Sequence, residues 1–213
     1  MRALKTQTET RKQQILKAAL ELIGAHGVYG LSIQAIAERV GIVPSALYRH
    51  FRSKDDVLDA ILELIQKRLL ANVSLVRKET TDPLRRLESL AMRHARMLSE
   101  NPAIPYIVLS DGIYAGHPDR KTRIAAIIRR YLNELEDIIE EGRGQGAIRA
   151  EVVPATAAVM FLGLLLPAAV LGSTFEDGFD MIGHVGNAWP AFMRGIAADN
   201  GVGKAGVPGP AVL

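Results

Sequence analysis

Apolar side chains recur at helical spacing along nearly the whole chain. Between Ile15 and Ile23 they fall three and four positions apart, and Gly27 follows where a helix would stop. The run from Thr10 to Gln13 fits a capping box. The pattern therefore predicts a first helix that begins near Thr10 and ends before Gly27.

Two short helices are predicted next, separated by a tight turn. Ser32 is placed to cap the second helix, whose apolar positions end at Gly41. Pro44 suits the first turn of a third helix reaching Phe51. Backbone amides in the first turn have no partner within the helix, so proline, which has no amide hydrogen, loses no hydrogen bond there. Gly41 permits a sharp turn and the small Ala37 a close approach, so the pair has the pattern of a helix-turn-helix.

A long fourth helix follows. Ser53 is predicted to cap it, Asp55 and Asp56 complement the helix dipole in its first turn, and its apolar stripe continues past Val76. Later helices are predicted around residues 84–98, 104–110, 124–142, 154–172 and 179–198. Gly142 is the predicted stop of the seventh helix.

The fold class that follows is all-α, with about nine helices, since the sequence contains no alternating strand pattern and no internal repeat. We predict an N-terminal three-helix helix-turn-helix domain over residues 1–54, joined by the long helix to a helical bundle over residues 55–198. Residues 199–213, rich in Gly, Pro and Val, are predicted to form a flexible tail.

The chemistry of the predicted third helix suits DNA. Ser45, Tyr48, Arg49 and His50 place polar groups on a helix that can enter a major groove about 12 Å wide. Residues 1–56 hold nine Lys and Arg against five Asp and Glu, whereas the remaining residues hold 17 against 18. The positive charge that would attract a polyanion is therefore concentrated in the first quarter of the chain.

The same segment resembles the TetR family of bacterial repressors, without a gap over about forty positions. The matching residues are Ile15, Ala18, Ala19, Leu22, Gly27, Ser32, Ile36, Ala37, Gly41, Leu47, Tyr48, His50, Phe51, Ser53, Lys54 and Leu58. The resemblance implies a homodimer whose divergent C-terminal domain binds a small molecule and releases operator DNA.

The resemblance also implies a division of DNA contacts. The positions matching Ser32, Tyr48 and Lys54 hold the phosphate backbone, which sets register but carries little sequence information. The positions that face the groove are Gln34, Val43, Pro44, Ser45, Arg49 and His50. Arg49 is the candidate for a guanine contact, with phosphate as the alternative, and His50 could instead pack beneath the helix. Double-stranded operator DNA is thus the predicted partner.

The effector site is predicted among helices four to eight, again from the resemblance. Polar-tipped side chains near its expected walls are the candidate ligand contacts: His94, Tyr106, Tyr114, His117, Arg123 and Tyr131. Each of them also has a structural interpretation, and for His94 we favour a core histidine bonded to a backbone carbonyl. The abundance of Ile, Leu, Met and Val predicts an apolar or amphipathic small-molecule effector.

Residues 152–175 carry no charged side chain, and a membrane span needs about 20 apolar residues. Pro154, Pro167 and several Gly and Thr residues count against a span. We favour the arrangement implied by the resemblance, a homodimer through the helices at about 154–172 and 179–198, with no membrane contact. Pro190 is predicted to kink or break the last helix.

Enzymatic function is not expected. The His residues are too scattered for a metal site, no cofactor is implied, and the glycines at 142, 144 and 146 lack the preceding strand of a phosphate-binding turn. The absence of cysteine and of an apolar N-terminal signal predicts a cytoplasmic protein. Two alternatives to a ligand-responsive repressor stay open: a non-specific nucleic-acid-binding protein, and a membrane-associated protein that uses the apolar helix at 152–175.

Overall fold

The computed structural model describes residues 2–175 and 179–198, and within them it contains nine α-helices and no β-sheet. The helices are α1 Arg2–His26, α2 Ile33–Val40, α3 Pro44–Leu47, α4 Lys54–Glu79, α5 Pro83–Glu100, α6 Ala103–Leu109, α7 Pro118–Gly144, α8 Pro154–Thr174 and α9 Met181–Ile196, with a 3₁₀ turn η1 at Asp111–Ile113. The all-α prediction is confirmed. The predicted tail at 199–213 lies outside the described residues.

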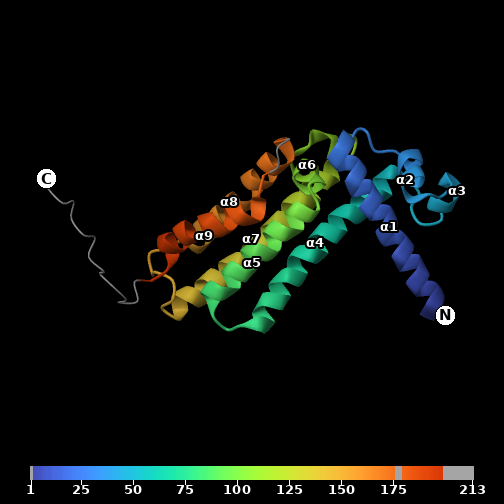
Figure 1. Ribbon diagram of the computed structural model, residues 1–213. Helices are drawn as coiled ribbons and strands as arrows, with labels where there is room; N and C mark the ends of the chain where they lie inside the picture. The colour runs from blue at the N-terminus through green and yellow to red at the C-terminus, as the bar shows by residue number, and fades with distance from the viewer. Residues whose placement is uncertain (1, 176–178, 199–213) are drawn as a thin grey trace.

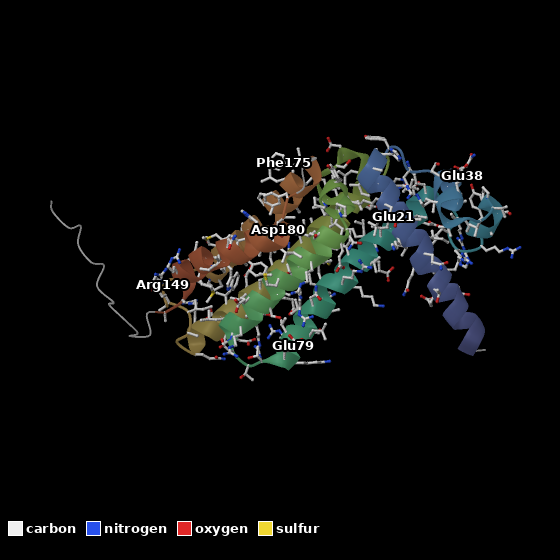
Figure 2. All side chains as sticks on the ribbon, in the orientation of Figure 1. Glu21, Glu38, Glu79, Arg149, Phe175 and Asp180 are labelled. Carbon is white, nitrogen blue, oxygen red and sulfur yellow. The ribbon has the colours of Figure 1, made fainter. Side chains whose placement is uncertain are left out.

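Helices α1, α2 and α3 gather at one end of the molecule, and α4 leads away from them beside α5 and α7 (Figure 1). Helices α8 and α9 form an outer layer across α5 and α7 from α4. Helix α6 packs against α1, at the junction of the two ends. We call α1–α3 the head and the bundle formed by the other helices the body. In Figure 2, Glu38 marks the head, and Glu79 marks the opposite end of α4.

The short helices of the head are delimited by the residues that the sequence singled out. The Ser32 hydroxyl accepts a hydrogen bond from the Ala35 amide at 3.1 Å, which caps α2. Gly41 ends α2 in the left-handed region, at φ 73°, where a side chain would be strained. Ile36 and Leu47 are fully buried where α2 and α3 meet.

Helix α4 starts with a reciprocal cap. The Ser53 hydroxyl accepts a hydrogen bond from the Asp56 amide at 3.1 Å, and the Asp56 carboxylate accepts one from the Arg52 amide at 2.9 Å. Val57 and Leu58 are buried at the head end of α4, and Val76 is buried near its far end. The predicted cap and length of α4 are therefore confirmed, and the helix belongs to both ends of the molecule.

Two predicted helix boundaries in the head are wrong. Helix α1 begins at Arg2, not near Thr10, because residues 2–14 contain no Gly or Pro to interrupt it. Helix α3 ends at Leu47 and does not reach Phe51. The chain tightens there, since the His50 amide donates to the Leu47 carbonyl three residues back at 2.8 Å.

Gly142 does not stop α7, which continues to Gly144. The chain reverses at Gly146, in the left-handed region at φ 69°, and the Ile148 amide then donates to the Gly142 carbonyl at 3.0 Å. Ile148 also forms an isolated antiparallel bridge with Ala197. Gly142 is needed for close packing: an added Cβ would lie 2.6 Å from Ile148 Cδ1 and 3.2 Å from Pro83 Cβ.

The apolar helix α8 runs without a break through Pro167, and α9 runs through Pro190, so the predicted break at Pro190 is absent. The stretch Pro154–Gly172 is long and apolar enough to cross a membrane, with mean hydropathy 2.1, and a third of it is buried. The buried side chains, which include Phe161 and Leu165, lie on a helix packed against α5, α6, α7 and α9. This packing makes one side of α8 part of the protein core.

We expect Gly142→Ala to lower the free energy of unfolding by about 1–3 kcal/mol, because the new methyl group overpacks the contact with Ile148 and Pro83. Gly144→Ala is the matched control: a Cβ there meets no atom within 4 Å, and alanine in a helix is favoured by up to about 1 kcal/mol. Urea denaturation measures both. Equal changes for the two variants would contradict the close approach at Gly142.

Candidate DNA interface and effector cavity

The residues at both ends of α3 in the head are largely exposed. Pro44 begins α3, Val43 precedes it with 62% of its surface exposed, and Tyr48 follows it with 54% exposed. Ser45 and Arg49 are also exposed, whereas Leu47 between them is buried and anchors the helix. Apolar and polar side chains exposed together at the tip of a helix-turn-helix are available to a partner.

The other predicted DNA contacts lie around this tip. Ser32 is exposed, and its hydroxyl is already the cap of α2. Gln34, two residues onward, donates to the Glu38 carboxylate at 3.1 Å. Lys54 is half-buried as the first residue of α4. His50 is half-buried, and its Nδ1 has no hydrogen-bond partner among the described residues.

Helices α4 to α8 line a cavity of about 70 Å³ in the body. Its walls are Leu62, Ile65, Leu69, His94, Met97, Leu98, Ile104, Val108, Ile124, Ile127, Ile128, Tyr131, Leu162 and Leu166. All but His94 and Tyr131 are aliphatic residues or methionine, and none carries a fixed charge. The cavity can therefore accept an apolar group, whereas an ionised group inside it would find no partner of opposite charge.

The two polar residues of the cavity bind each other. His94 Nδ1 lies 3.2 Å from the Tyr131 hydroxyl, and the two rings meet edge to face. His94 is a core histidine as predicted, but its partner is this hydroxyl and not the expected backbone carbonyl. Burial lowers the pKa of His94 from 6.5 to about 4 and raises the pKa of Tyr131, so both groups are neutral at pH 7.

The remaining candidate ligand contacts lie outside the cavity walls. Tyr106 is exposed on α6, and the Tyr114 hydroxyl donates to the Val108 carbonyl at 3.0 Å. His117 and Arg123 lie at the start of α7, where His117 Nε2 is 3.3 Å from Asp55 and Arg123 Nη1 is 3.7 Å from Asp59. Of the six candidates, the structure thus brings only His94 and Tyr131 together at the cavity.

Sequence reasoning missed Arg120, which lies between His117 and Arg123 on α7. Its side chain is buried and binds both Asp55 and Asp59 of α4 at 2.9 Å. Burial works to raise the pKa of Asp55, but its hydrogen bond and ion pair with Arg120 outweigh this effect and lower the pKa. The sequence shows that Arg120 lies three residues from His117 and from Arg123, and that Asp55 and Asp59 are four residues apart. It does not show that the two groups face each other in the fold.

The architecture is that of a helix-turn-helix DNA-binding protein with a second helical domain that holds a cavity. Comparisons with known proteins agree: residues 15–61 match the bacterial regulatory proteins of the tetR family, and residues 56–182 match the YsiA-like protein C-terminal region. The second match alone covers more than half of the chain.

Individual relatives are distant. The nucleoid occlusion factor SlmA of a Marinomonas species is 24% identical over 156 residues, covering 73% of this chain and 79% of the relative. The TetR-family regulator PfmR from Thermus thermophilus superimposes with a TM-score of 0.71 at 28% identity, covering 84% of this chain and 97% of PfmR. FadR from Bacillus subtilis, solved with stearoyl-CoA, superimposes with a TM-score of 0.72 at 19% identity, covering 86% of this chain and 98% of FadR.

The chain belongs to the TetR family of transcriptional regulators. It is therefore a DNA-binding regulator and not an enzyme, as the sequence predicted. The family consists of soluble proteins, which together with the packed face of α8 argues against the membrane-associated alternative.

His94 should make the stability of the fold depend on pH between 6.5 and 4. Over this range the unfolded chain takes up a proton at His94 and the folded chain does not, so the folded state loses about 3 kcal/mol relative to the unfolded state as the pH falls. His94→Leu should remove the contribution of His94 to this loss. The free energy of unfolding, measured by denaturation at pH 7 and pH 4.5, should then fall less in the variant than in the wild type. His26→Gln, at an exposed histidine, is the control, and an unchanged pH dependence in His94→Leu would contradict the assignment.

Proposed function

We propose that the protein is a dimeric, cytoplasmic repressor that a small apolar or amphipathic effector releases from its operator. The observation that carries this proposal is the uncharged cavity, because α4 both lines it and leads directly out of the DNA-reading head. An effector in that cavity would contact the helix on which the head is mounted.

The DNA contacts follow the division expected from the sequence. Ser32, Tyr48 and Lys54 hold phosphates, which positions the head on the duplex. The groove-facing residues are Gln34, Val43, Pro44, Ser45, Arg49 and His50. The exposure of Val43, Tyr48 and Arg49 at the tip of α3 supports this division, since these side chains make few contacts within the head.

Tyr48→Ala should weaken binding to every DNA sequence by roughly 10- to 100-fold, the effect of losing a hydrogen bond to a charged phosphate. Arg49→Ala should instead change which base is preferred at one position of each half-site, if Arg49 donates to guanine. Selection of binding sites from random duplexes tests both variants against wild type.

Tyr106→Ala, at an exposed tyrosine of the body, is the matched control and should leave DNA binding unchanged. Wild-type protein should select a pseudo-palindrome whose half-sites lie one or more helical turns apart, each about 34 Å. An unchanged base preference in Arg49→Ala would move Arg49 to the phosphate contacts, and selection of single half-sites would contradict the dimeric repressor.

The outer layer supports dimer formation. On α8, Val159 and Met160 are 58% and 52% exposed, and Val170 and Leu171 continue this apolar surface toward Phe175. Phe175 and Arg149 mark opposite ends of the α8–α9 layer, so the surface extends along the length of the body (Figure 2). Apolar surface exposed along a whole helix is typical of an oligomer interface, and the proposed homodimer pairs α8 and α9 with their copies.

Met160→Glu should weaken the dimer by more than roughly 100-fold, because an unpaired carboxylate would be buried between the subunits. Leu75→Glu is the control, since Leu75 is an exposed apolar residue of α4, away from this surface. Sedimentation equilibrium gives the mass of each. A monomeric wild-type protein, or a dimer that Met160→Glu leaves intact, would refute this interface.

The effector is proposed to place a neutral, apolar part in the cavity and to keep any charged group outside. The lack of a charged wall residue supports this choice, as does the neutral His94–Tyr131 pair. FadR of Bacillus subtilis, which shares the fold, was solved with stearoyl-CoA, a ligand with a long apolar chain and a charged head. The cavity of this chain is compatible with the apolar portion of such a molecule.

A nucleoid-associated role is the second candidate, favoured by the distant likeness to nucleoid occlusion factors. The same selection experiment separates the two functions. A non-specific nucleic-acid-binding protein would enrich no sequence and would lose affinity uniformly as salt is raised.

A further inference from the structure

The head and the start of α4 are joined to the rest of the body by α6 and η1 at a first place and by α7 at a second, in addition to the packing of α1 on α4. At the first, Gly24 of α1 faces Ala103 of α6, and the Tyr29 ring lies over Gly112 of η1. At the second, the first turns of α4 are bound by the first turns of α7. The two places differ in chemistry, and this difference decides which of them transmits a displacement.

At the second place, the Arg120 guanidinium is held entirely by α4. Its Nε donates to Asp59 Oδ1 at 2.9 Å, its Nη1 lies 2.9 Å from Asp55 Oδ1, and its Nη2 donates to the Asp55 carbonyl at 3.2 Å. Arg120 is only 4% exposed. A buried guanidinium without these partners would be strongly unfavourable, so α7 cannot leave the start of α4 without a large loss.

Two neighbouring side chains lie at the same junction. His117 and Arg123, one turn to either side of Arg120, also approach Asp55 and Asp59. The contact at Gly24, Tyr29 and Gly112 is made of small and aromatic surfaces, which can slide without leaving a charge unpaired.

The junction is close to the cavity along α7. Ile124, one turn after Arg120, is a cavity wall, and Ile127, Ile128 and Tyr131 follow on the same helix. At the other end of α4, Arg77 pairs with Glu134 and Glu141 of α7. Helices α4 and α7 are therefore joined by ion pairs at both ends, with the cavity between them.

The volume of the cavity makes movement of its walls necessary. Ligand pockets usually measure about 300–1,000 Å³, whereas this cavity measures about 70 Å³. An effector of ordinary size must therefore displace the helices around it. Helix α7 supplies more of the wall residues than any other helix, so it is the helix that an effector pushes against most.

We propose that Arg120 couples the cavity to the DNA-reading head: when an effector displaces α7, Arg120 carries Asp55, Asp59 and the start of α4 with it and reorients the head. This inference rests on the proposed function. Arg120 is a positioning residue, since it touches neither the cavity nor the tip of α3, and Ser53 and Lys54 immediately precede the turn that it holds.

The test compares Arg120→Met with Arg86→Met. Arg86 is also a buried arginine, and it binds Glu141 and the Thr80 carbonyl at the end of the body away from the head. Both variants remove a buried guanidinium from an ion-pair network, so a general loss of stability affects them alike. Arg120→Lys, which keeps the charge but cannot reach both carboxylates, serves if Arg120→Met does not fold.

The probes are decanol, decanoate and stearoyl-CoA. Their binding is followed by the fluorescence of Trp189, the single tryptophan, which contacts Phe161 on the cavity helix α8. The operator is the sequence selected by wild-type protein, and its affinity is measured with and without saturating probe. Wild-type protein should lose operator affinity by roughly 5- to 150-fold, the usual range of allosteric coupling.

Arg120→Met should bind the same probe with unchanged affinity. Its operator affinity should fall by less than roughly twofold when the probe is added. Arg86→Met should respond to the probe as the wild-type protein does. A full response in Arg120→Met, or an equal loss of response in Arg86→Met, overturns the coupling role and leaves the proposed function standing. Failure of every probe to release the wild-type protein overturns the proposed function, and the coupling with it.

Discussion

Helix α4 must bury apolar side chains on two different partners, and the arrangement of the molecule follows from this constraint. Val57, Leu58 and Ile61 are buried near its start and Val73 and Val76 toward its far end, and the helix packs against α1 of the head and against α5 and α7 of the body. A helix packed on both partners cannot rotate toward one without disturbing the other. The orientation of the head is therefore a property of the whole body.

The features that the sequence predicted correctly are those with a local cause. Ser32 and Ser53 cap helices because a hydroxyl reaches an amide three residues ahead, and Gly41 ends a helix because it adopts a positive φ. Each of these needs only a few consecutive residues. The family resemblance in the head has the same origin, since one short segment holds the caps, the turn and the exposed tip of α3.

Features that depend on distant partners were not predictable in this way. Gly142 has the sequence context of a helix stop, but its role is to admit Ile148 after the chain has reversed. His94 was placed in the core by its apolar neighbours, yet its partner Tyr131 is 37 residues away. Arg120 and Asp59 are 61 residues apart. For His94 the periodicity gives the correct face of the helix, and in all three cases only the packing of helices shows what the residue meets.

The cavity in the body has a consequence for how the protein responds to hydrostatic pressure. Internal voids are lost on unfolding, so a protein that contains them occupies a smaller volume when unfolded. The cavity lined by α4 to α8 leaves space of this kind among the helices, and its apolar walls give water few partners. Compression thus favours states in which these helices have come apart, and a molecule filling the space would make the body stiffer and less compressible.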